Sequence, residues 1–156
     1  MFVDYAEVEV AAGTGGSGAE AFRREKGVAM GGPSGGDGGR GGSVIVRADA
    51  QLATLLDYRY QQHYRAARGE HGQGKNRTGK DGADLVLRVP VGTVVRDAGT
   101  GDTLGELLAE GAELVVGRGG RGGRGNAAFA TPTNRAPRRW EPGVEGESRR
   151  IVLELK

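Results

Sequence analysis

Glycine fills 31 of the 156 positions, against a usual share of about 7%, but the net charge of only +2 argues against a uniformly disordered chain. No residue is cysteine, which excludes disulfides, thiolate zinc sites and cysteine catalysis and fits a reducing cytoplasm. No apolar run approaches the roughly 18 residues of a membrane helix, and residues 1–5 lack the apolar core of a secretory signal, so we expect a cytoplasmic chain without a membrane span.

Short segments rich in valine predict β-strands, and turn signals separate them. The first is the alternating stretch Tyr5 to Val10. Further strands are predicted at residues 43–47, 84–89, 91–95, 113–116 and 150–155, with a hairpin turn at 97–102. Residues 52–60 fit either one or two helical turns or a strand. Many short strands between turns predict an all-β fold, either a small β-barrel or a sandwich.

Glycine gathers in clusters between these strands, at residues 13–18, 27–42, 69–82 and 117–125. Within the clusters it recurs at every third position. Because polyproline II has three residues per turn, this spacing leaves one face of each segment bare and lets several segments pack closely. A flexible linker is the alternative, but linkers rarely keep a strict period. We therefore predict a packed polyproline-II bundle with structural glycines at Gly32, Gly35, Gly38, Gly41, Gly119, Gly122 and Gly125.

The alternation of strands and glycine tracts predicts a single domain over residues 1–156 with two parts. The barrel part comprises about residues 1–12, 43–60, 83–117 and 148–156. The glycine-rich and loop part comprises about residues 13–42, 61–82 and 118–147.

Positive charge is concentrated in two glycine-rich segments. Residues 51–82 carry six basic and three acidic side chains, and residues 117–140 carry six arginines and no acid. Arg118, Arg121 and Arg124 form an RGG run, which binds RNA in disordered proteins, although glycines packed inward with arginines outward for solubility fit the pattern equally well. Beyond the run, Arg135, Arg138 and Arg139 favour a phosphate-contacting loop tip over a solvated basic loop. Trp140 is either a stacking platform or a packing residue.

Two nucleotide-binding patterns occur in the wrong context. Gly13 to Gly18 reads Gly-x-Gly-x-x-Gly after a strand, but no second buried strand ending in an acid follows about 20 residues later. Gly69 to Lys75 reads Gly-x-x-x-x-Gly-Lys, but polar residues precede it and no apolar helix follows. With His63 and His71 as the only histidines, the residues predict no catalytic set and no metal site.

Several long motifs resemble the N-terminal domain of the Obg family of GTPases, and the resemblance covers essentially the whole chain. They include Gly31 to Gly42, Val89 to Val95 and Gly117 to Asn126. The others are Phe22 to Lys26, Asp57 to Tyr60, Arg68 to Gly72, Phe129 to Pro132, and Ile151 to Lys156.

The resemblance implies a β-barrel-like half that carries a glycine-rich half of packed polyproline-II helices. It also implies that this chain is a fragment with no cofactor of its own, followed after Lys156 by its own GTPase domain, which binds GTP and magnesium and makes the parent protein a hydrolase. The family acts in assembly of the large ribosomal subunit and in growth and stress control linked to guanine nucleotides, including ppGpp. Its N-terminal domain is similar to a wedge whose loop tips reach ribosomal RNA near the peptidyl-transferase centre.

The basic loop positions of the family align here in three groups, which are the RNA-binding candidates: Arg23, Arg24 and Lys26; Lys75, Arg77 and Lys80; Arg135, Arg138 and Arg139. Arg118, Arg121 and Arg124 are weaker candidates. The leading hypothesis is a module that binds large-subunit ribosomal RNA mainly through phosphate contacts. The alternative is a protein-interaction or regulatory domain whose basic loops are incidental.

Overall fold

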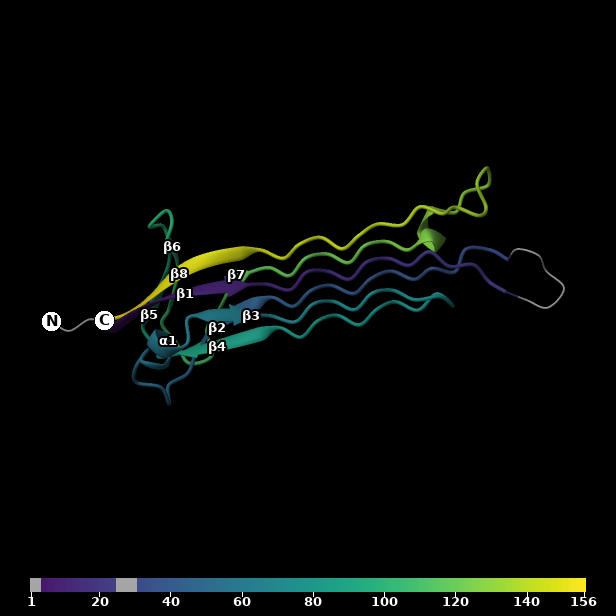
Figure 1. Ribbon diagram of the computed structural model, residues 1–156. Helices are drawn as coiled ribbons and strands as arrows, with labels where there is room; N and C mark the ends of the chain where they lie inside the picture. Colours follow the sequence, from purple (N-terminus) through teal and green to yellow (C-terminus); the bar gives the residue numbers. More distant parts are fainter. Residues whose placement is uncertain (1–3, 25–30) are drawn as a thin grey trace.

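The computed structural model describes residues 4–24 and 31–156 and shows two β-sheets at one end of an elongated molecule (Figure 1). The larger sheet has the strand order β3-β1-β8-β5-β6, and the smaller has the order β4-β2-β7. The strands are β1 (Asp4–Ala11), β2 (Val44–Ala48), β3 (His63–Arg65), β4 (Leu85–Val89), β5 (Thr93–Asp97), β6 (Thr103–Leu107), β7 (Glu113–Gly117) and β8 (Ser148–Leu155). The helical elements among the described residues are the single turn α1 (Asp57–Tyr60) and the 3-10 turn η1 (Asn126–Phe129).

The two sheets share one apolar core, which is built from the inward-facing residues of their strands. In β1, Ala6, Val8 and Val10 are buried while the residues between them are exposed. Ile151 and Leu153 of β8 are fully buried beside them, because β1 and β8 pair antiparallel along their whole length, from Asp4 opposite Leu155 to Ala11 opposite Ser148. The core thus fixes the register of the two strands that bracket the described chain. The all-β fold predicted from the strand pattern is confirmed.

The structure differs from the strand predictions at two places. The strand predicted at 91–95 begins at Thr93, because Pro90 and Gly92 form a turn in which Gly92 has a φ of 94°. β3 was absent from the sequence prediction because its three residues, His63 to Arg65, show no apolar alternation. The ambiguous stretch 52–60 ends in the one-turn helix α1, where Leu55 and Tyr58 are buried.

The glycine-rich segments leave the sheets and run side by side to the opposite end of the molecule (Figure 1). Backbone hydrogen bonds join them at every third residue: Gly13, Gly16 and Ala19 donate to the carbonyls of Gly42, Gly39 and Gly36. The same spacing links Gly120 and Gly123 to Gly13 and Gly16. This answers where the backbone polar groups of the long non-strand segments are satisfied. The segments form an ordered, hydrogen-bonded bundle, which we call the glycine bundle.

Close packing explains the glycines of this bundle. A Cβ atom added to Gly38 would overlap the backbone carbonyl of Gly16, and one added to Gly41 would overlap that of Gly13. Equivalent overlaps with backbone atoms would arise at the other predicted structural glycines Gly35, Gly119, Gly122 and Gly125. Gly32 differs, because a Cβ atom there would meet no atom of the described residues within 4 Å. Packing therefore requires glycine at six of the seven predicted positions but does not require it at Gly32.

Candidate nucleic-acid interface

Three turns of the chain meet at the end of the glycine bundle that lies away from the sheets (Figure 1). We call residues 20–24 and 31–34 the first tip, residues 73–80 the second tip and residues 126–141 the third tip. Lys26, the third basic candidate of the first tip, lies outside the described residues. All other candidates fall on these tips except the RGG arginines Arg118, Arg121 and Arg124, which lie along the bundle.

Backbone hydrogen bonds hold the first and second tips against each other. The amide of Asn76 donates to the carbonyl of Ser34 over 2.8 Å, and the amide of Gly36 donates to Gln73 over 2.9 Å. The amide of Ser34 donates in turn to Ala21 over 2.8 Å. These bonds fix the relative positions of the two chain segments that carry Arg23, Arg24 and Lys75.

The turn of the second tip has a strained backbone. Lys75 and Asn76 have φ angles of 63° and 55°, in the left-handed region, which costs an L residue about 1–2 kcal/mol. Gln73 and Arg77 close the turn by a β-bridge. Lys75 lies within this turn and is exposed.

Stacking and ion pairs organise the third tip. The guanidinium groups of Arg124 and Arg139 lie 4.6 Å and 4.4 Å from the ring centroid of Phe129, within the range of cation–π attraction. Arg124 also donates two hydrogen bonds to Glu141, over 2.9 Å and 3.2 Å. Arg138 makes a long ion pair of 3.7 Å with Glu20 of the first tip. Both arginines are stacked on Phe129 and exposed, but Arg124 is ion-paired with Glu141, whereas Arg139 has no ion pair with a described residue.

Hydrogen bonding from Arg124 lowers the pKa of the Glu141 carboxyl group. Its side chain and its backbone amide both donate to the Glu141 carboxylate, and the positive charges of Arg124 and Arg139 add to their effect. Together they lower the pKa of Glu141 from 4.5 to about 2. The same contact raises the pKa of Arg124. The Arg124–Glu141 pair, which we call the clasp, therefore stays fully charged at neutral pH.

Asn126, which is not among the site residues predicted from the sequence, connects the first and third tips. It is completely buried. Its side-chain oxygen accepts from the amides of Gly35 and Ala21 over 2.8 Å and 3.3 Å, and its side-chain nitrogen donates to the carbonyls of Ala21 and Pro137, each over 3.0 Å. Every polar atom of the side chain is used. Asn126 therefore sets the spacing between the loops that carry the basic residues.

The remaining basic candidates are exposed and have no ion pair with a described residue. This group comprises Arg24, Lys75, Arg77, Lys80, Arg118, Arg121 and Arg135. Arg23 is exposed as well, but it is engaged in a further interaction. Unpaired exposed cations attract anions most strongly where several lie together, and among the candidates this condition is met at the tips.

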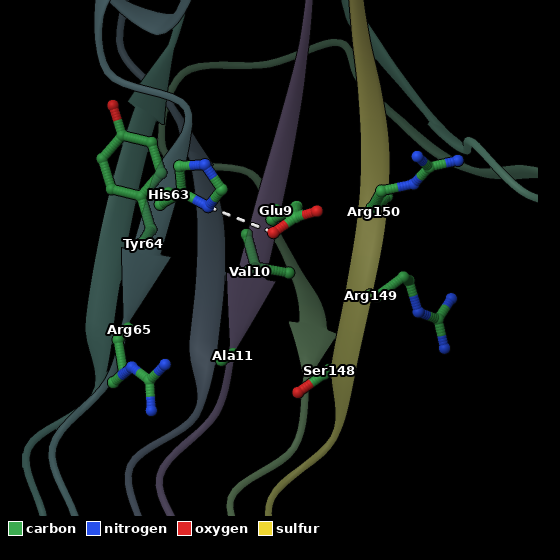
Figure 2. Close-up of a pocket in the computed structure, with 9 residues that line it drawn as sticks. All are labelled: Glu9, Val10, Ala11, His63, Tyr64, Arg65, Ser148, Arg149 and Arg150. Carbon is green, nitrogen blue, oxygen red and sulfur yellow. Dashed lines mark ion pairs between the residues drawn. The ribbon is translucent and has the colours of Figure 1, made fainter.

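The larger sheet has a separate hollow of about 570 Å³ (Figure 2). Its polar centre is an ion pair of 3.1 Å between His63 and Glu9, whose side chains are 78% and 54% exposed. Arg149 and Arg150 point away from this pair (Figure 2). Ser148 pairs with Ala11 of β1, whereas His63 pairs with Glu9, two residues away along the same strand. The Ser148 hydroxyl and the His63 imidazole are therefore at different positions along β1. The hollow holds a surface ion pair and no nucleophile placed against a base.

Neither nucleotide-binding pattern forms a phosphate-binding loop. In the stretch 13–18, Gly13, Gly15 and Gly16 already donate to the carbonyls of Gly42, Val144 and Gly39. In the stretch 69–75, the amides of Gly69 and Gly72 donate to the carbonyls of Thr14 and Ser17. Backbone amides that are bonded within the bundle cannot cradle a phosphate, so the structure supports the rejection of both motifs.

Two further properties concern the described residues alone. Among residues 4–24 and 31–156, no three histidine, aspartate or glutamate side chains gather in a way that could hold a metal ion. Within the same ranges, no helix has the length and apolar character required to cross a membrane.

Comparison with known proteins places these features in a family context. A family model described as GTP1/OBG matches residues 3–156. A protein named GTPase Obg from Moorella thermoacetica is 62% identical over 156 residues, which is 100% of this chain and 37% of that protein. Proteins of the same name from Chloroherpeton thalassium and Sulfurihydrogenibium sp. are each 58% identical over the whole chain, which covers 47% and 45% of their lengths. The chain thus spans less than half the length of these relatives.

Proposed function

Because the chain belongs to the GTP1/OBG family, we propose that it is the module through which a larger GTPase binds the RNA of the large ribosomal subunit. In this proposal the sheets and the glycine bundle form one domain, and the bundle is a rigid spacer that holds the three tips toward the RNA. The basic residues of the tips contact phosphates, which positions the module without reading base sequence.

One observation carries the proposal: exposed cations without ion pairs gather on turns that are fixed to one another at one end of the bundle. Arg24, Lys75 and Arg77 belong to this set. Because backbone hydrogen bonds already join the turns, binding would not need to order their backbone, which reduces the loss of conformational entropy. A pre-organised cationic surface of this kind suits a large, structured polyanion.

The proposal extends to the parent protein. Its relatives carry the name GTPase Obg and are more than twice as long as the matched region. We propose that a GTPase domain following Lys156 binds GTP and Mg²⁺, and that the whole protein is a cytoplasmic hydrolase of large-subunit assembly with a role in growth and stress control, including the stringent response. The glycine patterns at residues 13–18 and 69–75 do not supply a GTP-binding loop, because amides of both are bonded within the bundle.

We further propose that the segments of the glycine bundle are polyproline-II helices. Their hydrogen bonds recur at every third residue, and so do the glycines that face a neighbouring backbone. A helix of three residues per turn produces both repeats from one cause.

A protein-interaction or regulatory domain with incidental basic loops is the alternative. It predicts binding to a protein partner that survives high salt, whereas phosphate contacts weaken steeply as salt rises.

Charge reversal tests the proposed function. The triple variant Arg77→Glu, Arg138→Glu, Arg139→Glu should bind large ribosomal subunits at least ~100-fold more weakly than the unmodified chain, because charge-assisted contacts to phosphate are lost. The plot of log affinity against log salt should also become flatter by about 2 to 3. Co-sedimentation at several salt concentrations measures both.

A matched control separates position from net charge. The variant Arg65→Glu, Arg68→Glu, Arg150→Glu changes the net charge equally, but its exposed residues lie outside the tips. It should keep most of the affinity. Equal loss in the two triple variants, or unchanged binding of the tip variant, would sink the assignment of the interface to the tips.

A further inference from the structure

We propose that the cavity between the first and second tips is a binding pocket for one unpaired, phosphate-bearing nucleotide of an RNA strand. The inference rests on the proposed function and deepens it, because it assigns a defined ligand to one place on the tips. The cavity has a volume of about 580 Å³, within the roughly 300–1,000 Å³ typical of small-molecule pockets.

The charge of the pocket selects an anion. Arg23, Arg24 and Lys75 line it, and none of its described lining residues is acidic. The three cations come from two chain segments, which lets them approach one phosphate group from different sides. An arginine fork offers paired donors to phosphate oxygens, while the lysine acts as a compact point charge.

The neutral walls of the pocket suit the rest of a nucleotide. Phe22 lines the cavity and supplies an aromatic surface on which a base can stack. Ser34 also lines it, and although this residue is only 2% exposed, its hydroxyl has no hydrogen bond to a described residue and is not sealed from solvent. An acidic peptide would use the cations but would leave the aromatic wall unused.

The pocket is built before any ligand arrives. The amide of Asn76 donates to the carbonyl of Ser34 over 2.8 Å and joins its two walls. A β-bridge between Phe22 and Pro33 closes the first tip behind the cavity. A concave site of this size cannot receive a base that is stacked inside a duplex, whereas an unpaired nucleotide can be splayed out of its strand. The shape thus favours single-stranded RNA.

The strained turn supplies a variant that removes the charge without harming the fold. Lys75 has a φ of 63°, and glycine adopts this conformation without steric cost. Lys75→Gly should therefore be at least as stable as the unmodified chain. Arg68→Ala also removes one exposed cation, but Arg68 lies outside the tips and does not line the pocket, so it is the matched control.

Binding of a short unpaired oligoribonucleotide by the full chain, followed by fluorescence anisotropy over a range of salt concentrations, tests the pocket. Lys75→Gly should weaken binding about tenfold and flatten the salt dependence by about 0.7, the value for one contact to a single strand. Arg68→Ala should change neither quantity. Phe22→Leu keeps an apolar wall but removes the aromatic face, and it should weaken binding about fivefold or more without changing the salt dependence.

Comparison of several anionic ligands tests whether the pocket prefers an unpaired RNA strand. A blunt RNA duplex of equal length and a free mononucleotide should both bind more weakly than the unpaired strand. A mononucleotide that binds as tightly as the strand would overturn the assignment to RNA, and an acidic peptide that competes equally well would overturn the assignment to a nucleotide.

The outcomes also distinguish this inference from the proposed function. If the unmodified chain bound the strand, and Lys75→Gly left both affinity and salt dependence unchanged while charge reversal in the third tip abolished binding, the pocket would be refuted and the RNA-binding module would stand. If the unmodified chain bound no RNA at all, both proposals would fall.

Discussion

At the scale of single residues, the function of glycine in this chain is to make room for a neighbouring backbone. At Gly38 and Gly122 the position of a missing side chain is filled by the carbonyl of another segment of the bundle. Backbone cannot move aside as the end of a flexible side chain can, so even one methyl group is expected to displace a whole segment. Gly32 shows that the three-residue period alone does not decide where glycine is required, because no atom of the described residues lies within 4 Å of a Cβ added there.

Gly38→Ala should destabilise the protein by about 3 kcal/mol or more, since the new methyl group overlaps the carbonyl of Gly16. This corresponds to a fall in Tm of roughly 6–12 °C for a domain of this size. Gly32→Ala is the control and should leave Tm unchanged or slightly higher. Thermal unfolding followed by circular dichroism measures both variants. Similar Tm values for the two would refute the close packing of the bundle.

At the scale of elements, a few polar side-chain contacts join the tips to one another and to the bundle. Asn126 ties the first tip to the third, and the Arg124–Glu141 pair closes the base of the third tip. The sequence predicted the strands well because alternation of buried and exposed valines is a local signal, as in β1. Asn126 gave no such signal: its importance depends on partners far along the chain, including Gly35. The pocket at the tips was equally invisible, because two distant turns form it.

The Arg124–Glu141 clasp predicts a pH dependence. The folded-state pKa of Glu141, about 2, lies below its ordinary value of 4.5, so the clasp contributes stability that is complete above about pH 4.5 and is lost as the pH falls toward 2. The stability difference between the unmodified chain and Glu141→Gln should therefore shrink over this window. Urea unfolding at a series of pH values measures it.

The control for this effect is Glu145→Gln, which alters an exposed carboxylate that has no ion pair with a described residue. Its stability difference from the unmodified chain should stay flat over the same window. A flat difference for Glu141→Gln as well would show that the clasp does not hold the third tip.

At the scale of the whole molecule, the glycine bundle separates the β-sheets from the basic tips. The sheets lie at one end, and the tips lie at the other (Figure 1). The net charge of +2 conceals a local excess of positive charge, since residues 117–140 carry six arginines and no acid. Family membership, expected from long motifs such as Gly31 to Gly42, is confirmed by the match over residues 3–156. The three-dimensional meeting of the basic turns could not be read from the sequence, since it depends on the packing of the glycine bundle.

Site-specific photocrosslinking to large ribosomal subunits tests the central claim most directly. A photoreactive side chain replaces Thr78 of the second tip, Thr133 of the third tip, or Leu108, which is 69% exposed beside the sheets. If the tips face the ribosomal RNA, crosslinks to it should form from positions 78 and 133 and none from position 108. RNA crosslinks from position 108, with none from the two tips, would contradict it.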